Sequence, residues 1–192
     1  MSKGFGSGSS KKKINVKQII LDKRFAEGEE LYFAKNYSKA ELIFLKLIDS
    51  GYENPSLFLY LSNIYIFNGS DEKAKICLKT ALVINPDNPN IYFSLATIHF
   101  KRNEFDLAKS YLLQGLNLDP KNSFALSNLA GCYEELLEFK DAVENYKKAF
   151  FLNKNLLQTR EKLIDLQPKI CDWSLYRYFE AVSYTHLRAH ET

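Results

Sequence analysis

Few side chains in this sequence have the types and spacing of a catalytic site. Two pairs of adjacent carboxylates, Glu29-Glu30 and Glu134-Glu135, could work as an acid and a base if they converged on one point. Adjacent residues on a helix point in different directions, so neither pair converges. The sequence contains no glycine-rich phosphate loop after a strand and no nucleophile motif. We therefore expect these residues to catalyse no reaction and to hold no cofactor.

The cysteines offer thiol or metal chemistry only if they pair. Cys77, Cys132 and Cys171 are odd in number and show no C-x-x-C spacing. Cys77 and Cys132 fall inside predicted helices as small core residues. We therefore expect reduced thiols in a cytoplasmic protein, with no disulfide and no metal site.

A repeat with a constant period is the strongest pattern in the chain. Counting from Leu21 gives four blocks of equal length, which cover residues 21–54, 55–88, 89–122 and 123–156. Position 20 of each block is alanine: Ala40, Ala74, Ala108 and Ala142. Position 8 is always small: Gly28, Ser62, Ala96 and Ala130. Position 24 is always bulky and apolar: Phe44, Leu78, Leu112 and Tyr146.

This alternation of small and bulky residues predicts pairs of closely packed helices. Apolar residues recur at three- and four-residue spacing within each half block, as an amphipathic helix requires. Turn-forming residues separate the halves and the blocks, such as Asn68-Gly69-Ser70 inside block two and Pro86 and Pro120 near the ends of blocks two and three. His99 takes position 11, where blocks two and four carry tyrosine, so we expect it to pack rather than to catalyse.

The length of the blocks and this pattern together resemble the tetratricopeptide repeat (TPR) family, whose repeats span about 34 residues. The resemblance implies an all-α fold, a TPR superhelical solenoid of four antiparallel helix pairs with a C-terminal capping helix. The predicted organisation has four parts. These are a disordered basic leader of Gly, Ser and Lys (1–15), the four repeats (16–156), the capping helix with the start of a further domain (157–181), and a tail (182–192).

The tail has an origin of its own. Residues 182–192 read Val-Ser-Tyr-Thr-His-Leu-Arg-Ala-His-Glu-Thr, which resembles one reading frame of a transposase-end sequencing adapter. We therefore expect the natural sequence to continue differently after Ala181 and expect no function for His186 and His190. The alternative is a short polar C-terminal tail.

A short string before the tail suggests which kind of domain comes after the repeats. Residues 170–176 read Ile-Cys-Asp-Trp-Ser-Leu-Tyr, directly after a predicted helix over 156–167. A Cys-Asp-Trp-Ser/Thr-x-Tyr string after a TPR array resembles the start of the catalytic region of the O-linked N-acetylglucosamine transferase and SPINDLY family. That resemblance implies a nucleotide-sugar-dependent glycosyltransferase whose catalytic residues all lie beyond this point. Trp173, Tyr176 and Phe179 could instead, or also, form an ordinary capping helix that shields the apolar face of the last repeat. The competing hypothesis for the function is a non-enzymatic TPR adaptor, or a TPR module ahead of a different enzyme.

Charge is unevenly distributed. Residues 1–24 carry seven basic side chains and one acidic one, a net charge of +6, in a chain with a net charge of +3. A basic tail could contact anionic lipid or nucleic acid. It has no aromatic residue apart from Phe5 to stack on bases. We therefore expect a solvated leader that contacts neither nucleic acid nor a membrane, and the sequence has no apolar run long enough for a membrane span.

The concave face of a TPR array, built by the first helix of each pair, is its usual binding surface. We expect a protein or an extended peptide to bind there, without a metal. The polar and aromatic candidates on this face are Tyr60, Asn63, Asn90, Phe93, Ser94, Thr97, Ser127 and Asn128.

Two known modes of peptide binding fit these candidates poorly. TPR domains that hold C-terminal carboxylates use a clamp of Lys, Arg and Asn, and the clamp is absent from positions 5 and 9 of these blocks. The glycosyltransferase family carries an asparagine ladder at position 6. This chain has Ala26, Tyr60, Ser94 and Asn128 there, so only Asn128 conforms. The lining is polar, mostly uncharged and partly aromatic.

Overall fold

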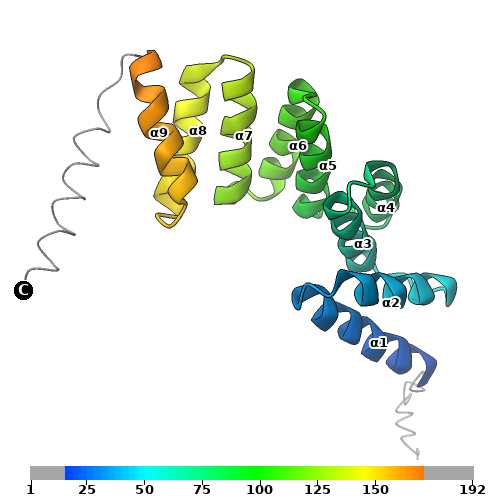
Figure 1. Cartoon of the computed structure of the whole chain (residues 1–192). Helices are drawn as coiled ribbons and strands as arrows, with labels where there is room; N and C mark the ends of the chain where they lie inside the picture. The colour runs from blue at the N-terminus through cyan, green and yellow to red at the C-terminus, as the bar shows by residue number, and fades with distance from the viewer. Residues whose placement is uncertain (1–15, 171–192) are drawn as a thin grey trace, which may run out of the picture. The chain divides into compact units, whose positions relative to one another are not determined.

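The computed structural model describes residues 16–170, and all the regular structure in this range is helical. The predicted all-α fold of helix pairs is therefore confirmed (Figure 1). In chain order the helices are α1 (Val16–Phe33), α2 (Tyr37–Asp49), α3 (Pro55–Phe67), α4 (Asp71–Ile84), α5 (Pro89–Lys101), α6 (Phe105–Leu118), α7 (Ser123–Glu135), α8 (Phe139–Leu152) and α9 (Leu157–Ile170). None of these helices is long and apolar enough to cross a membrane.

The chain divides into two compact units, residues 1–57 and 58–192. In the first unit α1 packs against α2, and the small residue at position 8 explains how closely. A Cβ atom on Gly28 would lie 2.5 Å from Cε1 of Phe44, so any larger residue there would force the Phe44 ring to shift. The Tyr52 hydroxyl group, just beyond α2, donates a 2.8 Å hydrogen bond to Oδ1 of Asp22 on α1. Tyr52 thus ties the two helices together at the place where later blocks carry proline or lysine.

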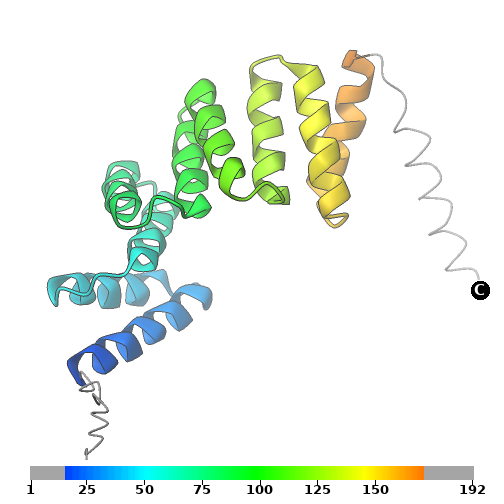
Figure 2. The same ribbon diagram turned by 180° about the vertical axis from the view of Figure 1, so that it is seen from behind.

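The second unit continues the alternation of first and second helices. Lys73 on α4 lies over the Tyr65 ring on α3, 5.6 Å from its centroid. Further along, α5 packs on α6, α6 on α7, α7 on α8 and α8 on α9. Two opposite views both show α7, α8 and α9 side by side (Figures 1 and 2). Each helix therefore contacts mainly its sequence neighbours, as in other repeat proteins.

The turn inside each repeat has the same backbone conformation in all four blocks. Position 15 has a positive φ every time: Lys35 at 59°, Gly69 at 72°, Asn103 at 60° and Leu137 at 63°. The residue after it donates its N–H to a carbonyl five residues back, as Glu104 does to His99 and Glu138 to Tyr133. This is the bonding pattern of a Schellman motif, which ends the first helix and starts the second.

The alanines at position 20 mark where the helices of a pair meet. Ala40, Ala74, Ala108 and Ala142 are all fully buried, as the repeat register predicts. In blocks two to four the first helix also buries positions 3, 7 and 10, for example Ile91, Leu95 and Ile98 on α5.

Helix α9 follows the same rule, which makes it the first helix of a fifth block. Thr159, Leu163 and Leu166 occupy positions 3, 7 and 10 counted from residue 157, and all three are buried. Position 8, which is small in every earlier block, is Ile164 here and is 37% exposed. The helix therefore covers the last repeat as the predicted cap. The predictions for the leader, the Cys-Asp-Trp string and the adapter-like tail fall on residues 1–15 and 171–192, outside the described range.

Candidate functional site

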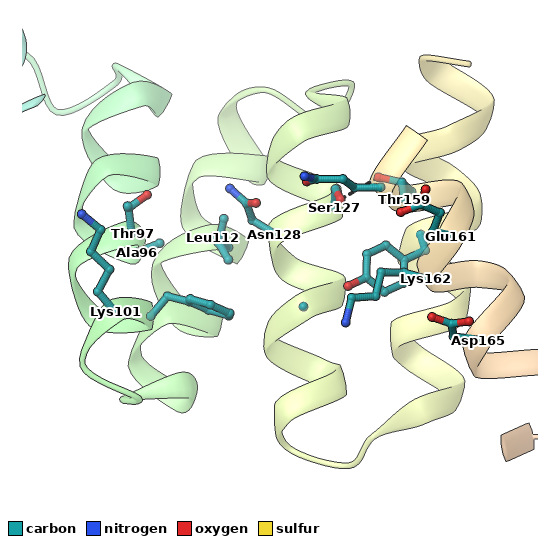
Figure 3. Close-up of a pocket in the computed structure, with 14 residues that line it drawn as sticks. Ala96, Thr97, Lys101, Leu112, Ser127, Asn128, Thr159, Glu161, Lys162 and Asp165 are labelled. Atoms are coloured by element: carbon teal, nitrogen blue, oxygen red, sulfur yellow. Dashed lines mark hydrogen bonds between the residues drawn. The ribbon is translucent and has the colours of Figure 1, made fainter. Parts of the chain in front are cut away.

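The first helices α5, α7 and α9 enclose a groove of about 490 Å³, here called the inner groove (Figure 3). Leu112 of α6 and Tyr146 of α8 close it between them. Its volume lies within the range of roughly 300–1,000 Å³ that is typical of ligand sites. Ala96, Thr97, Phe100 and Lys101 line it from α5; Ser127, Asn128 and Gly131 line it from α7; Gln158, Thr159, Glu161, Lys162 and Asp165 line it from α9.

Three of the eight predicted residues, Thr97, Ser127 and Asn128, line this groove. Two of them already make internal hydrogen bonds. The Thr97 hydroxyl group donates to the Phe93 carbonyl oxygen at 2.9 Å, and the hydroxyl oxygens of Ser127 and Thr159 are 2.8 Å apart. Asn128 is exposed, so its side-chain amide can both donate to and accept from a ligand.

The other five predicted residues lie outside the inner groove. The Ser94 hydroxyl group donates a 3.0 Å hydrogen bond to Oδ1 of Asn63, which joins α5 to α3. Phe93 packs its ring on Gly115 of α6 and belongs to the core of these repeats. Tyr60 is half-buried, and Asn90 is exposed at the start of α5. Position in the repeat alone does not show whether a side chain is taken up by packing.

Sequence reasoning missed the part of the groove next to Gly131. A Cβ atom on Gly131 would lie 3.7 Å from both the Phe100 ring and the Tyr146 hydroxyl oxygen, which is ordinary contact distance. The glycine therefore leaves a gap between two aromatic side chains. Its signal in the sequence is a glycine at position 9, where the two preceding blocks carry Asn63 and Thr97.

Charged residues of α9 also enter the groove, which the sequence analysis described as mostly uncharged. Glu161, Lys162 and Asp165 come from this helix, whereas Lys101 comes from α5 (Figure 3). The difference arises because α9 acts as a fifth first helix, and the four-block register did not include it. Lys101 is positioned by a 3.0 Å hydrogen bond that its ammonium group donates to the Ile66 carbonyl oxygen.

Glu134 holds two of the side chains that line the groove, Tyr146 and Lys162. Its carboxylate accepts a hydrogen bond from the Tyr146 hydroxyl group at 3.1 Å and pairs with the Lys162 ammonium group at 3.0 Å. Burial, and then the charge of Glu134, raise the pKa of Tyr146 well above its usual value. The phenol therefore stays protonated and acts as a hydrogen-bond donor.

His99 has a packing role, as its place in the repeat predicts. His99 Nδ1 lies 2.5 Å from Oε2 of Glu104, and the His99 ring stacks on Tyr111 with centroids 5.3 Å apart. No group of three or more His, Cys, Asp or Glu side chains within residues 16–170 is arranged to hold a metal ion.

Comparisons with known proteins agree with this architecture. The tetratricopeptide repeat family model matches residues 57–88 and 89–122. No curated protein matches the sequence.

Several solved structures have a similar fold. A crystal structure of MamA is 18% identical, with a TM-score of 0.71 over 86% of this chain and 97% of that chain. The pilF protein of Pseudomonas aeruginosa is 18% identical, with a TM-score of 0.72 over 91% of this chain and 78% of that chain. The first TPR of Spaghetti (RPAP3), bound to an HSP90 peptide, is 19% identical, with a TM-score of 0.59 over 62% of this chain and 96% of that chain.

At these identities the likeness to solved structures shows the fold alone. The family model and the helix pairs of the structure lead to the same result. Residues 57–122 are tetratricopeptide repeats, and the chain has the fold of a TPR solenoid.

Proposed function

We propose that this chain is a protein-interaction scaffold that binds an extended peptide of a partner protein in the inner groove. The observation that carries the proposal is the exposed Asn128 amide beside the gap at Gly131, in a groove of about 490 Å³. The similar TPR of Spaghetti was solved with a peptide bound, which supports a peptide as the ligand.

The inner groove can recognise a peptide through hydrogen bonds to its backbone and through contacts with its side chains. Asn128 can pair with a peptide N–H and C=O at once, because a side-chain amide both donates and accepts. The gap between Phe100 and Tyr146 accepts one apolar side chain of the peptide. Lys101 and Asp165 stand on opposite sides of the groove (Figure 3), so an acidic residue of the peptide would lie near α5 and a basic residue near α9.

Peptides selected from a random library on the full chain test this proposal. Asn128→Ala should cost about 1 kcal/mol of binding, because each such hydrogen bond is exchanged against water. Gly131→Leu should block binding by filling the gap. Asn90→Ala is the matched control, since Asn90 is an exposed asparagine outside the inner groove.

Deletion of residues 1–15 tests whether peptides bind to the inner groove or to the basic leader. Peptides held by the groove should bind equally well without the leader. The inner groove is not the binding site if every selected peptide loses its affinity when the leader is deleted. The same holds if neither Asn128→Ala nor Gly131→Leu changes the affinity of any selected peptide.

A more specific role rests on the sequence alone. We propose that the scaffold recruits substrates for a glycosyltransferase resembling the O-linked N-acetylglucosamine transferases. The support is the Cys-Asp-Trp-Ser-x-Tyr string at 171–176, which follows α9 directly. A non-enzymatic TPR adaptor, or a TPR module ahead of another enzyme, is the competing role.

The genomic sequence downstream of the codon for Ala181 decides between these roles. A long α/β region with two nucleotide-sugar-binding lobes supports the glycosyltransferase. An early stop codon supports the adaptor, and a different catalytic domain supports the third alternative. None of these results affects the test of the inner groove.

A further inference from the structure

A second groove lies on the second helices of the repeats. It runs between α6 and α8, has a volume of about 550 Å³, and is here called the outer groove. The apolar side chains that line it are Leu113, Leu116, Leu126, Leu129, Phe151 and Leu152. Leu113, Phe151 and Leu152 are 43%, 55% and 47% exposed. Covering such a patch removes apolar surface from water, and contiguous patches of this kind mark interaction sites.

The outer groove offers little to an extended backbone. Its uncharged polar side chains are the amides of Asn117 and Asn145, one from each of the two helices. An extended segment buried there would leave most of its N–H and C=O groups without partners, which is costly. A helix satisfies its own backbone and presents apolar side chains at three- and four-residue spacing. The chemistry of this groove therefore favours a helical ligand, unlike that of the inner groove.

The charged side chains that line the outer groove are both lysines, Lys121 and Lys148. A third, Lys154, lies 4.2 Å from the ring centroid of Phe151. Glu144 pairs with Lys148 at 2.7 Å, but both side chains are more than half exposed. Exposed pairs contribute little, so a ligand carboxylate can replace Glu144. The basic rim selects a ligand with acidic flanks.

We propose that the outer groove binds an amphipathic helix of a partner protein, whose apolar stripe enters between α6 and α8 and whose flanks carry Asp or Glu. The proposal does not depend on the peptide site of the inner groove, because the two grooves share no lining residue. A scaffold with both sites would hold two partners, or two segments of one partner, at the same time.

The probe is a synthetic helix of about 16 residues with leucine at i, i+3, i+4 and i+7, glutamate on both flanks and alanine elsewhere. A second peptide carries lysine in place of glutamate. The acidic peptide should bind the full chain, more weakly as salt rises, and the basic peptide should bind at least about tenfold more weakly. Backbone amide NMR shifts of the full chain should change at α6 and α8.

Matched variants locate the site. Leu113→Glu should weaken binding of the acidic peptide at least about tenfold. Leu107→Glu, on the same helix and 50% exposed but outside the groove, should leave it unchanged. Lys121→Glu should weaken binding of the acidic peptide. Lys140→Glu, at an exposed lysine of α8 outside the groove, should not. Circular dichroism of each variant shows that it is folded.

Three results would overturn the proposal. The first is that the acidic peptide binds no better than the basic one. The second is that Leu107→Glu weakens binding of the acidic peptide as much as Leu113→Glu does. The third is that neither Leu113→Glu nor Lys121→Glu changes the affinity for the acidic peptide. Binding of the chain and its variants to vesicles containing phosphatidylserine tests whether the outer groove recognises lipid instead. If Leu113→Glu and Lys121→Glu release the chain from vesicles yet leave peptide binding intact, the surface recognises lipid and the helix proposal is wrong.

Discussion

The ring of Phe93 on α5 lies against the Cα atom of Gly115 on α6, so closely that a Cβ atom on Gly115 would overlap two ring carbons, Cδ1 and Cε1. This contact fixes how near the two helices of the third repeat approach. Gly131 is also in a helix, but a Cβ atom there meets nothing closer than 3.7 Å, which is ordinary contact distance. Close packing therefore favours glycine at position 115 but does not require it at position 131.

The same substitution at these glycines should have effects of opposite sign. Gly115→Ala should lower the free energy of unfolding by roughly 1–3 kcal/mol through overpacking against Phe93. Gly131→Ala should raise it by about 0.4–1 kcal/mol, because alanine restricts the unfolded chain and fits the helix. Urea denaturation of both variants measures the difference. If both substitutions change the free energy of unfolding equally, the Phe93 ring can move away from the added methyl group at little cost.

The turn residue Leu137 should be replaceable with a gain in stability. It holds φ at 63° and is 72% exposed, so its side chain contributes little packing against the cost of the left-handed conformation. Leu137→Gly should therefore stabilise the chain by up to about 1 kcal/mol, after allowing for the greater freedom of glycine in the unfolded state.

Leu107→Gly is the control for Leu137→Gly. It removes an exposed leucine from the first turn of α6, where glycine should cost up to about 1 kcal/mol. Thermal unfolding of both variants checks the prediction, and a destabilised Leu137→Gly chain would contradict it.

Acid should weaken the fold partly through Glu104. The hydrogen bond from His99 holds the pKa of the Glu104 carboxyl below its ordinary value of 4.5. The stability that comes from this lowered pKa is complete above pH 4.5 and is lost as the pH falls through the pKa of the folded state. The Glu104→Gln variant should therefore be less stable than the unsubstituted chain at about pH 6, and this difference in stability should shrink in acid.

Urea titrations across this pH range measure the effect of Glu104→Gln. Glu135→Gln, at an exposed glutamate on α7, controls for the change in net charge. A difference that grew on acidification would have the wrong sign for a lowered carboxyl pKa.

The two cysteines of the described helices should react slowly with thiol reagents. Burial raises the pKa of the Cys77 and Cys132 thiols to about 11. At about pH 8 only roughly one part in a thousand is then thiolate, the reactive form. In a Cys171→Ser background, labelling by a disulfide reagent should be slow in buffer and fast in urea. Fast labelling of the folded chain would show that these helices open readily.

The repeat register predicted the fold because packing in this protein is local. The alanines at position 20 and the bulky residues at positions 7 and 24 contact helices near in sequence, so the constant block length is enough to place them. The same arithmetic places Thr159, Leu163 and Leu166 on a fifth first helix. Because the large Ile164 stands at position 8, the sequence predicted this helix as a cap and not as the first helix of a fifth block.

The groove was less predictable, because it depends on which side chains are already in use. Ser94 and Asn63 stand at binding positions but bond to each other, and Phe93 turns onto Gly115. Asn128 occupies the same repeat position as Ser94 and remains exposed. A repeat position gives the direction of a side chain, whereas its availability depends on the residues packed around it in its own and the adjacent repeats.

The turn at position 15 limits how the length of this chain can change. Lys35, Gly69, Asn103 and Leu137 share one conformation, so hydrogen bonding of the backbone rather than any one residue type sets the joint. Inserting or deleting one whole block would reproduce the joint and keep every buried position facing its neighbour. A segment of another length would rotate the next helix and expose its apolar face. Insertions and deletions in such a chain therefore keep the packing only when they comprise whole repeats.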